Sequence, residues 1–342
     1  MSKLTAMPSL GQLAAVRVSL RPRHSLVAPL SPAGSLAAII SLLLVAAMCG
    51  SIAAEGPAPS AAFPPDLVSW RPRANNPVFI AAGLGHWDVK IRERGWILRD
   101  KDGYRMWFTG YDGNRDSRKL LGLATSPDGL KWTRSPKNPL VRDHWVEDVT
   151  VIEEKSNYYM FAEGEHDNHA ELLTSPDGLT WTWQGELEVR AADGRTAAKK
   201  PCGTPTVWVE NGVWYLFYEW NDKGVWLARS SNPLSRVWTN VQNAAILLPG
   251  PADYDKDMIA MDQVIKRDGI YYAIYHGSGS GEAVPRTWST DIARSTDLVH
   301  WEKYAHNPIV ADNKSSGEIV ETDAGPRLYT MHNQVDVFEP AN

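Results

Sequence analysis

The sequence has few cysteines, which argues against a fold held together by disulfide bonds. Only Cys49 and Cys202 occur among the 342 residues. If an N-terminal leader is removed, Cys202 remains alone and no internal disulfide can form. A hydrophobic core must then supply the stability, and roughly 285 residues are enough to build one.

Residues 1–54 lack any acidic side chain. Four basic residues precede the apolar run 36–48, and small residues follow that run. This order is typical of a signal peptide with cleavage near residues 53–55, and the run is too short for a transmembrane helix. We therefore expect 1–54 to be a leader that directs a secreted or periplasmic protein with no membrane span. Lipid attachment through Cys49 is the alternative.

The remaining chain lacks a basic excess. Its formal charge moves from −5 to −9 without the leader, because the leader carries Lys3, Arg17, Arg21 and Arg23 and no acid. Nucleic-acid binding needs a basic surface, so we expect no nucleic-acid partner. Residues 55–66 are rich in proline and alanine and predict a linker, followed by one domain over 67–342.

Sustained helical periodicity is also absent from the chain after the leader, which is instead repetitive. The phrase Ser-Pro-Asp-Gly-Leu-Lys-Trp at 126–132 is nearly copied at 175–181, and weaker versions begin at Ser230 and Ser295. The serines stand 49, 55 and 65 residues apart. Spacing of this order indicates a repeat architecture.

Each repeat contains a strand, a tight turn, an aromatic strand and a third strand before the Ser-to-Trp turn. The aromatic strands are expected at 104–110, 158–164, 214–220 and 271–277, with a weaker one at 327–332. Strand, Asx-Gly turn and strand is a strong hairpin signal. Repeated four-stranded antiparallel units predict an all-β fold, a β-propeller.

The ends of the chain set the number of blades. Trp70, Trp132 and Trp301 are each followed six residues later by Asn-Pro, so the N-terminal segment resembles the outer strand of a blade. The last unit, from Glu318 onward, has no outer strand of its own. We therefore expect five four-stranded antiparallel blades, with the N-terminal strand completing the C-terminal blade. The Ser-to-Trp turns are predicted to be structural, with each tryptophan packed between blades.

Polar residues stand where the first strand of a hairpin begins and the second ends. These ends lie on one face, so their side chains should converge on a central funnel. The candidate catalytic residues are Asp88, Glu93, Asp148, Glu219 and Asp262. The candidate substrate-binding residues are Trp87, Tyr111, Glu163, Trp220 and His276.

Carboxylates interleaved with tryptophans are what glycoside hydrolysis needs. One carboxylic acid protonates the leaving oxygen, and one carboxylate activates water or attacks. A third can keep the acid protonated by like-charge repulsion, while aromatic rings stack on sugars. We therefore expect a carbohydrate substrate and a monomeric enzyme without a cofactor. Solvated carboxylates at strand ends are the alternative interpretation.

The segments Glu-Asp-Val-Thr-Val-Ile at 147–152 and Met-Asp-Gln-Val-Ile at 261–265, with the Tyr-Tyr strands and the Ser-to-Trp turns, carry a family resemblance. They resemble the five-bladed propeller glycosidases, namely glycoside hydrolase family 43 and the related invertases and levansucrases. The mannoside phosphorylase and anhydrogalactosidase families share this architecture. The resemblance covers residues 68–342.

The resemblance implies an inverting hydrolase of plant- or algal-type saccharides. It assigns Asp88 or Glu93 as general base, Asp148 as the residue that tunes the acid, and Glu219 or Asp262 as general acid. Two family features are missing, because Val149 replaces the proline of an Asp-Pro pair and Gly-Thr-Pro stands at 203–205 instead of an acid-bearing Glu-Gly-Pro.

Several alternatives stay open from the sequence. His276 could replace the carboxylic acid as proton donor. A metal could bind among the acidic and histidine residues of the second repeat, which are Glu163, Glu165, His166, Asp167 and His169. A non-catalytic carbohydrate-binding propeller would lack a suitably spaced carboxylate pair. A glycoside phosphorylase would need a basic phosphate pocket, to which Arg92 and Arg94 could contribute.

Overall fold

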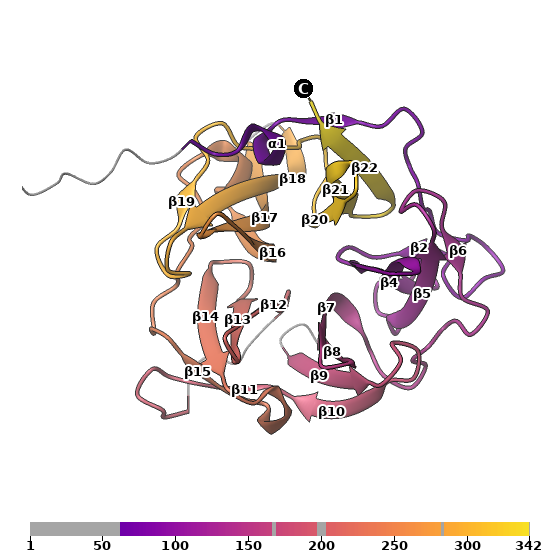
Figure 1. The fold of residues 1–342 in the computed structure, drawn as a ribbon, viewed down its shortest axis with the longest axis horizontal. Helices are drawn as coiled ribbons and strands as arrows, with labels where there is room; N and C mark the ends of the chain where they lie inside the picture. Colours follow the sequence, from indigo (N-terminus) through magenta and orange to yellow (C-terminus); the bar gives the residue numbers. More distant parts are fainter. Residues whose placement is uncertain (1–61, 166–168, 197–202, 282–283, 342) are drawn as a thin grey trace, which may run out of the picture. The chain divides into compact units, whose positions relative to one another are not determined.

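Five small β-sheets stand around a central axis in the computed structural model (Figure 1). The structure describes residues 62–165, 169–196, 203–281 and 284–341. The predicted leader, most of the predicted linker, both cysteines, His166 and Asp167 lie outside these residues. The regular secondary structure of the described chain is nearly all β, with three short helices, as the repeats predict.

Blades one and two follow the expected order from axis to rim. Blade one contains β2 (Lys90–Ile91), β3 (Trp96–Asp100), β4 (Gly103–Tyr111), β5 (Leu120–Ser126) and β6 (Thr133–Arg134). Both β2 and β3 pair with β4, so one interrupted strand takes the innermost place. Blade two contains β7 (Glu147–Glu154), β8 (Asn157–Glu163), β9 (Ala170–Ser175) and β10 (Thr182–Glu186).

Blade three differs from the expected four-stranded antiparallel unit. It contains β12 (Thr206–Glu210), β13 (Val213–Glu219), β14 (Val225–Ser230) and β15 (Val237–Asn240), with a short helix η1 (Pro233–Ser235) before β15. A fifth strand, β11 (Glu188–Arg190), pairs in parallel with β15. This strand belongs to the connection from blade two, whose backbone finds partners on the outer edge of the sheet.

Blades four and five complete the ring. Blade four contains β16 (Met258–Arg267), β17 (Ile270–Gly281), β18 (Val284–Ser295) and β19 (Glu302–Lys303), preceded by the short helix η2 (Asp253–Asp255). Blade five contains β20 (Gly317–Thr322), β21 (Gly325–Met331) and β22 (Val335–Pro340). Its outer strand is β1 (Trp70–Pro72), which follows helix α1 (Pro65–Val68) and pairs antiparallel with β22. The predicted closure of the ring by the N-terminal strand is confirmed.

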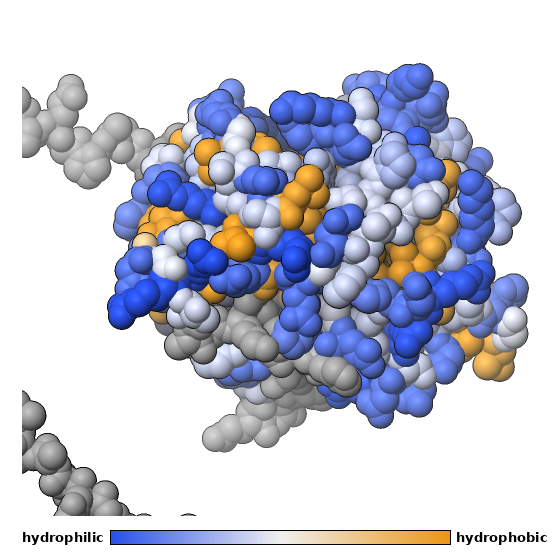
Figure 2. Space-filling model, turned by 90° about the horizontal axis from the view of Figure 1, so that it is seen from below, coloured by the Kyte–Doolittle hydropathy of each residue, from blue (hydrophilic) through white to orange (hydrophobic). Residues whose placement is uncertain are grey.

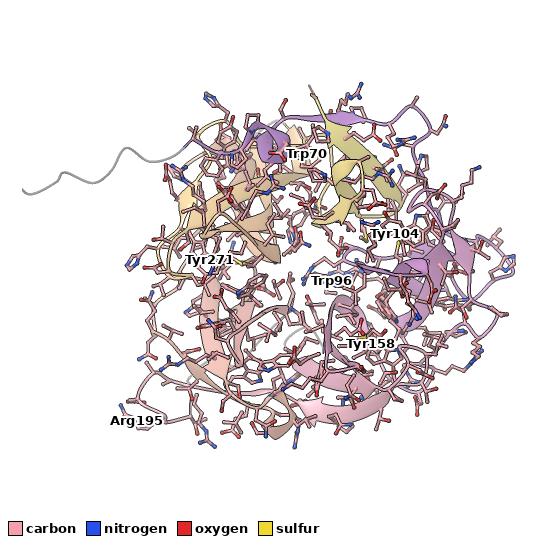
Figure 3. The ribbon with its side chains drawn as sticks, in the orientation of Figure 1. Trp70, Trp96, Tyr104, Tyr158, Arg195 and Tyr271 are labelled. Atoms are coloured by element: carbon pink, nitrogen blue, oxygen red, sulfur yellow. The ribbon has the colours of Figure 1, made fainter. Side chains whose placement is uncertain are left out.

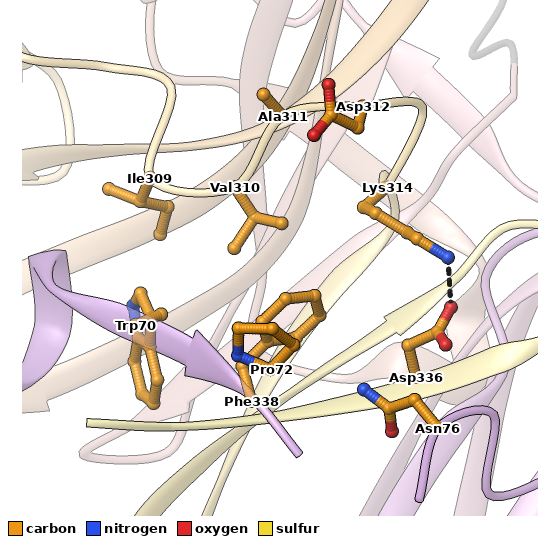
Figure 4. Close-up of a pocket in the computed structure, with 10 residues that line it drawn as sticks. All are labelled: Trp70, Pro72, Asn76, Ile309, Val310, Ala311, Asp312, Lys314, Asp336 and Phe338. Carbon is orange, nitrogen blue, oxygen red and sulfur yellow. Dashed lines mark hydrogen bonds and ion pairs between the residues drawn. The ribbon is translucent and has the colours of Figure 1, made fainter. Parts of the chain in front are cut away.

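The seam made by this closure encloses a cavity of about 470 Å³ (Figure 4). Trp70 and Phe338 face it from blade five, and Ile309 and Val310 face it from the loop after blade four. Lys314 and Asp336 form an ion pair at one end. The lining is mostly apolar, as expected where two ends of a chain pack together.

The Ser-to-Trp turns have the structural role that was predicted. In the first copy, Ser126 Oγ accepts a hydrogen bond from the Gly129 amide at 2.9 Å, and Asp128 Oδ1 accepts one from Leu130 at 2.9 Å. The second copy reaches back to blade one, because Trp107 Nε1 donates to the carbonyl of Gly178 at 2.9 Å. The rings of Trp107 and Trp181 meet edge to face at 6.1 Å.

Aromatic side chains fill the spaces between neighbouring blades (Figure 3). Tyr158 of blade two lies 5.9 Å from the Trp107 ring of blade one, and Tyr271 of blade four lies 6.3 Å from the Trp208 ring of blade three. Burying rings this large is worth roughly 1.5–3 kcal/mol each. The packed spaces hold the five blades at fixed angles and so fix the inner strand ends.

The face that Figure 2 presents is mainly hydrophilic, with scattered apolar residues. Among the described residues, no helix has the length and apolar character needed to cross a membrane.

Candidate active site

A cavity of about 690 Å³ lies at the axial ends of the inner strands, and residues of all five blades line it. Six predicted site residues lie on its wall: Glu93, Tyr111, Asp148, Glu163, Glu219 and His276. His332 of blade five and Arg92 of blade one join them. The convergence that was predicted from strand ends therefore holds for these residues.

Four predicted site residues lie outside this wall. Asp88 is buried, and its carboxylate accepts a hydrogen bond from Arg134 Nε at 2.8 Å. Trp87 packs against Phe108 at 5.7 Å, and Trp220 packs on the core between blades two and three. Each indole is partly buried against these neighbours, so neither ring faces the cavity. Asp262, the fourth, lies in the layer beneath the cavity.

A break in the inner strand of blade one brings Glu93 to the cavity. Arg94 has a positive φ of 48°, and a Cβ at Gly95 would lie only 2.6 Å from the carbonyl oxygen of Trp107. The chain therefore turns sharply between β2 and β3. Glu93 Oε1 pairs with Arg92 Nη2 at 3.0 Å and Oε2 lies 3.3 Å from His332 Nδ1. Its side chain is 28% exposed, so water reaches this carboxylate.

Asp148 enters the cavity from blade two, also at a positive φ, 50°. Its Oδ2 accepts a hydrogen bond from Thr204 Oγ1 at 3.4 Å, and its buried Oδ1 has no partner. Burial raises the pKa of Asp148 to about 8, with repulsion from Glu147 and Glu93 adding to the rise. This carboxyl group is therefore mostly protonated at neutral pH.

Glu219 comes from the end of β13 in blade three and is almost fully buried. Burial and the nearby Asp222 carboxylate raise its pKa to about 8, although a hydrogen bond from the Asp222 amide to Oε2 at 2.5 Å opposes the rise. A buried carboxylic acid that keeps its proton at pH 7 has the properties of a general acid.

Gly203 lets two glutamates approach each other. A Cβ at this position would lie 2.0 Å from Glu163 Oε2 and 2.8 Å from Glu219 Oε1. Both oxygens are this close to one point, so they are less than about 4.8 Å apart. Glu163 Oε2 also accepts a hydrogen bond from the Thr204 amide at 3.3 Å. A side chain at position 203 would collide with both glutamates, which is why glycine stands at this position.

A buried ionic layer lies beneath the cavity. Asp262 Oδ1 lies 2.7 Å from His276 Nδ1 and 3.4 Å from Arg94 Nε. Burial by itself would lower the pKa of His276, but the Asp262 carboxylate raises it to about 9. The His276 ring, 5.3 Å from the Trp288 ring, is therefore cationic at neutral pH and faces the cavity.

Asp222 and Trp288 line the cavity but were not predicted from the sequence. Asp222 follows Asn221 three residues after Glu219, and both have positive φ, so the Asn-Asp pair after the strand was an available signal. Trp288 lies near the start of β18 (Val284–Ser295), and its side chain lines the cavity.

Stability should fall as pH rises from about 4 to 8. Asp148 and Glu219 bind a proton in the folded protein up to about pH 8, whereas unfolded carboxyl groups release theirs near pH 4. Their stabilising contribution is therefore complete below pH 4 and lost as pH rises through about 8. Asp148→Asn should flatten this fall, measured as the unfolding temperature against pH. Asp323→Asn, at a carboxylate whose side chain is 91% exposed, is the control. An unchanged slope in Asp148→Asn contradicts the expectation.

Within the described part of the chain, no group of three or more potential metal-ligating His, Cys, Asp or Glu side chains is found. Of the metal cluster considered from the sequence, Glu163 instead lines the cavity, and His166 and Asp167 lie outside the described residues.

Comparison with known proteins identifies the fold. No protein-family model matches the chain, and no curated protein sequence is similar to it. A glycosyl hydrolase from Bacteroides ovatus superposes with a TM-score of 0.67 at 17% identity, over 82% of this chain and 97% of that one. A structure from the GH130 family of mannoside phosphorylases, which contains glycoside hydrolases that target β-1,2 mannosidic linkages in Candida mannan, gives a TM-score of 0.65 at 15% identity. That match covers 83% of this chain and 97% of the other. The chain shares the five-bladed propeller architecture of these proteins.

Proposed function

We propose that this chain is a glycoside hydrolase that cleaves glycosidic bonds in plant- or algal-type oligo- or polysaccharides. The observation that carries the proposal is the contrast between two carboxyl groups at one cavity. Glu219 is buried, with its pKa raised to about 8, while Glu93 is solvent-accessible and paired with Arg92. An acid and a base held in opposite environments are the two groups that this chemistry requires.

In this proposal Glu219 is the general acid and Glu93 the general base. Asp148 is the tuning residue, because repulsion between its carboxylate and that of Glu219 disfavours ionisation of both groups together and so contributes to the raised pKa of Glu219. Glu93 is favoured over Asp88 as base because Asp88 is held by Arg134 away from the cavity wall. Glu219 is favoured over Asp262 as acid because Asp262 is committed to His276 and Arg94.

We propose an inverting mechanism. The acid and the base must act on opposite sides of the scissile bond, and Glu93 and Glu219 come from blades one and three, which are not neighbours in the ring. Glu163 and Glu219 both lie against Gly203, and their oxygens are too close together to admit a water molecule between them. Inversion needs carboxyl groups about 6.5–9.5 Å apart, whereas a retaining pair is about 5–5.5 Å apart.

The test is turnover of a panel of aryl glycosides and of arabinan, xylan, mannan and agarose. Proton NMR at early times should detect the product anomer of inverted configuration. Asp148→Asn, with its circular dichroism unchanged, should lose most of this turnover. A product of retained configuration would overturn the assignment of Glu93 as base and favour Glu163 as nucleophile. Binding without turnover on every substrate would favour the carbohydrate-binding propeller.

A phosphorylase is the second candidate, because Lys90 and Arg115 line the cavity beside Arg92. Inorganic phosphate separates the two functions: a phosphorylase releases sugar phosphate only when phosphate is present, whereas a hydrolase turns over without it.

We also propose that residues 1–54 direct export and that the mature protein is a monomer. The basic, apolar and small-residue order of that segment supports export. N-terminal sequencing of the exported protein should give a start near residue 54, and a start at Met1 would contradict this. A molar mass larger than that of one chain, measured by light scattering, would contradict a monomer.

A further inference from the structure

Trp183, on the outer strand of blade two, is 47% exposed. The other large hydrophobic side chains exposed in the described part of the chain are aliphatic: Ile80, Leu84, Leu234 and Leu248. The remaining tryptophans mostly pack between blades, which is where the fold uses indole rings. An indole left in water therefore needs a reason other than core packing.

The Trp183 ring is held in one orientation by polar groups. Its Nε1 donates to Glu171 Oε2 at 2.8 Å, and the His144 ring lies 4.7 Å away, tilted by 51°. His144 Nε2 lies 3.5 Å from the same Glu171 oxygen. Glu171 is buried, and its Oε1 has no hydrogen-bond partner in the structure. The cluster thus combines a fixed aromatic face and an imidazole, both held by one buried carboxyl group.

Two routes of contact join this cluster to the cavity. Trp145, next to His144 in the chain, donates from Nε1 to Glu147 at 2.9 Å. Its ring also holds Lys119 Nζ at 4.2 Å, and the same ammonium lies 4.7 Å from the ring of Tyr111 on the cavity wall. The second route runs through Glu163, which lies on the cavity wall. The next residue, Gly164, packs closely on Glu171, because a Cβ at Gly164 would lie 3.1 Å from Glu171 Oε2.

We propose that Trp183, His144 and Glu171 form a sugar-binding subsite outside the cleavage cavity. The apolar face of a pyranose ring stacks on the indole, and its hydroxyl groups bond to the imidazole, while the buried Glu171 carboxyl group holds both rings in place. Because Glu171 holds the indole in place before binding, little side-chain entropy is lost when the sugar arrives. The inference rests on the proposed glycosidase function and deepens it: the substrate is a saccharide chain long enough to reach from the cavity to blade two.

Trp183→Ala should weaken the binding of long substrates without affecting short ones. KM for the polysaccharide that the enzyme hydrolyses should rise about 3- to 10-fold, the size of one aromatic stacking contact. Turnover of the matching 4-nitrophenyl glycoside, which ends within the cavity, should not change. Trp183→Phe should recover much of the affinity because it keeps an aromatic face. Leu234→Ala, at a side chain that is 52% exposed on blade three, is the matched control and should leave KM and turnover unchanged for both substrates.

Direct binding distinguishes failure of the inference from failure of the proposed function. Affinity electrophoresis of Glu219→Gln protein in gels containing arabinan, xylan, mannan or agarose should give a retardation that Trp183→Ala reduces. Retardation that depends on Trp183 without any hydrolysis by the parent enzyme supports the subsite and refutes the glycosidase. Hydrolysis in which Trp183→Ala affects long and short substrates equally, or affects neither, refutes the subsite alone.

Discussion

Replacing Glu219 with glutamine is expected to lower kcat on a saccharide substrate about 10²- to 10⁴-fold, the usual contribution of a positioned general acid. The amide keeps the shape of the side chain and can still accept the hydrogen bond from the Asp222 backbone. It cannot give a proton to the leaving oxygen. The loss should therefore come from chemistry and not from folding.

The leaving group gives this prediction its sharpest test. A 2,4-dinitrophenyl glycoside departs without protonation, so Glu219→Gln should retain most of its activity on it while losing activity on the saccharide. Glu210→Gln, at the opposite end of the blade-three hairpin, is the control and should leave both activities intact. If Glu219→Gln slows both substrates equally, Glu219 is not the acid, and the cationic His276 beside it becomes the better candidate.

The blades and their closure were predictable because their signals are local. Asp-Gly turns, Tyr-Tyr strands and the Ser-to-Trp phrases each act over a few residues, and their repetition shows that each unit needs neighbours to bury its aromatic rings. The cavity residues were predictable for a related reason. In a hairpin, the start of one strand and the end of the next must share a face, so Asp148, Glu219 and His276 could be placed without knowing the packing.

The parts that could not be predicted depend on contacts between distant segments. Nothing near Trp87 or Trp220 in the sequence indicates that their rings pack inward, because an indole at a strand end suits either a sugar or a core. The parallel strand β11 arises from a connection that meets the edge of blade three. Arg94 was considered for a phosphate pocket, yet its side chain is buried among residues of the other blades and does not line the cavity.

Arg94→Met is expected to destabilise the propeller by about 3–5 kcal/mol, the cost of removing one partner from a buried ion pair. The Arg94 side chain is only 2% exposed. Its Nη2 donates to Thr206 Oγ1 at 2.7 Å in blade three and to Thr150 Oγ1 at 3.2 Å in blade two. It also donates to the Asp262 carbonyl of blade four at 3.1 Å. The Arg94 amide donates to Met331 of blade five at 3.0 Å. One residue of blade one therefore bonds to every other blade.

Urea unfolding of Arg94→Met against Arg99→Met measures this effect. Arg99 pairs with Asp323 at 2.7 Å on the surface, where solvent screens the interaction, so Arg99→Met should unfold almost as the parent protein does. The double variant Arg94→Met/Asp262→Asn then separates charge from hydrogen bonding. If the loss of the Arg94 charge beside Asp262 causes the destabilisation, the double variant will be more stable than Arg94→Met alone. If the donors to Thr150 and Thr206 matter more, it will be no more stable, and the guanidinium acts chiefly by joining the blades. If Arg94→Met lowers the free energy of unfolding only slightly, aromatic packing between the blades holds the ring together without the buried Arg94 guanidinium.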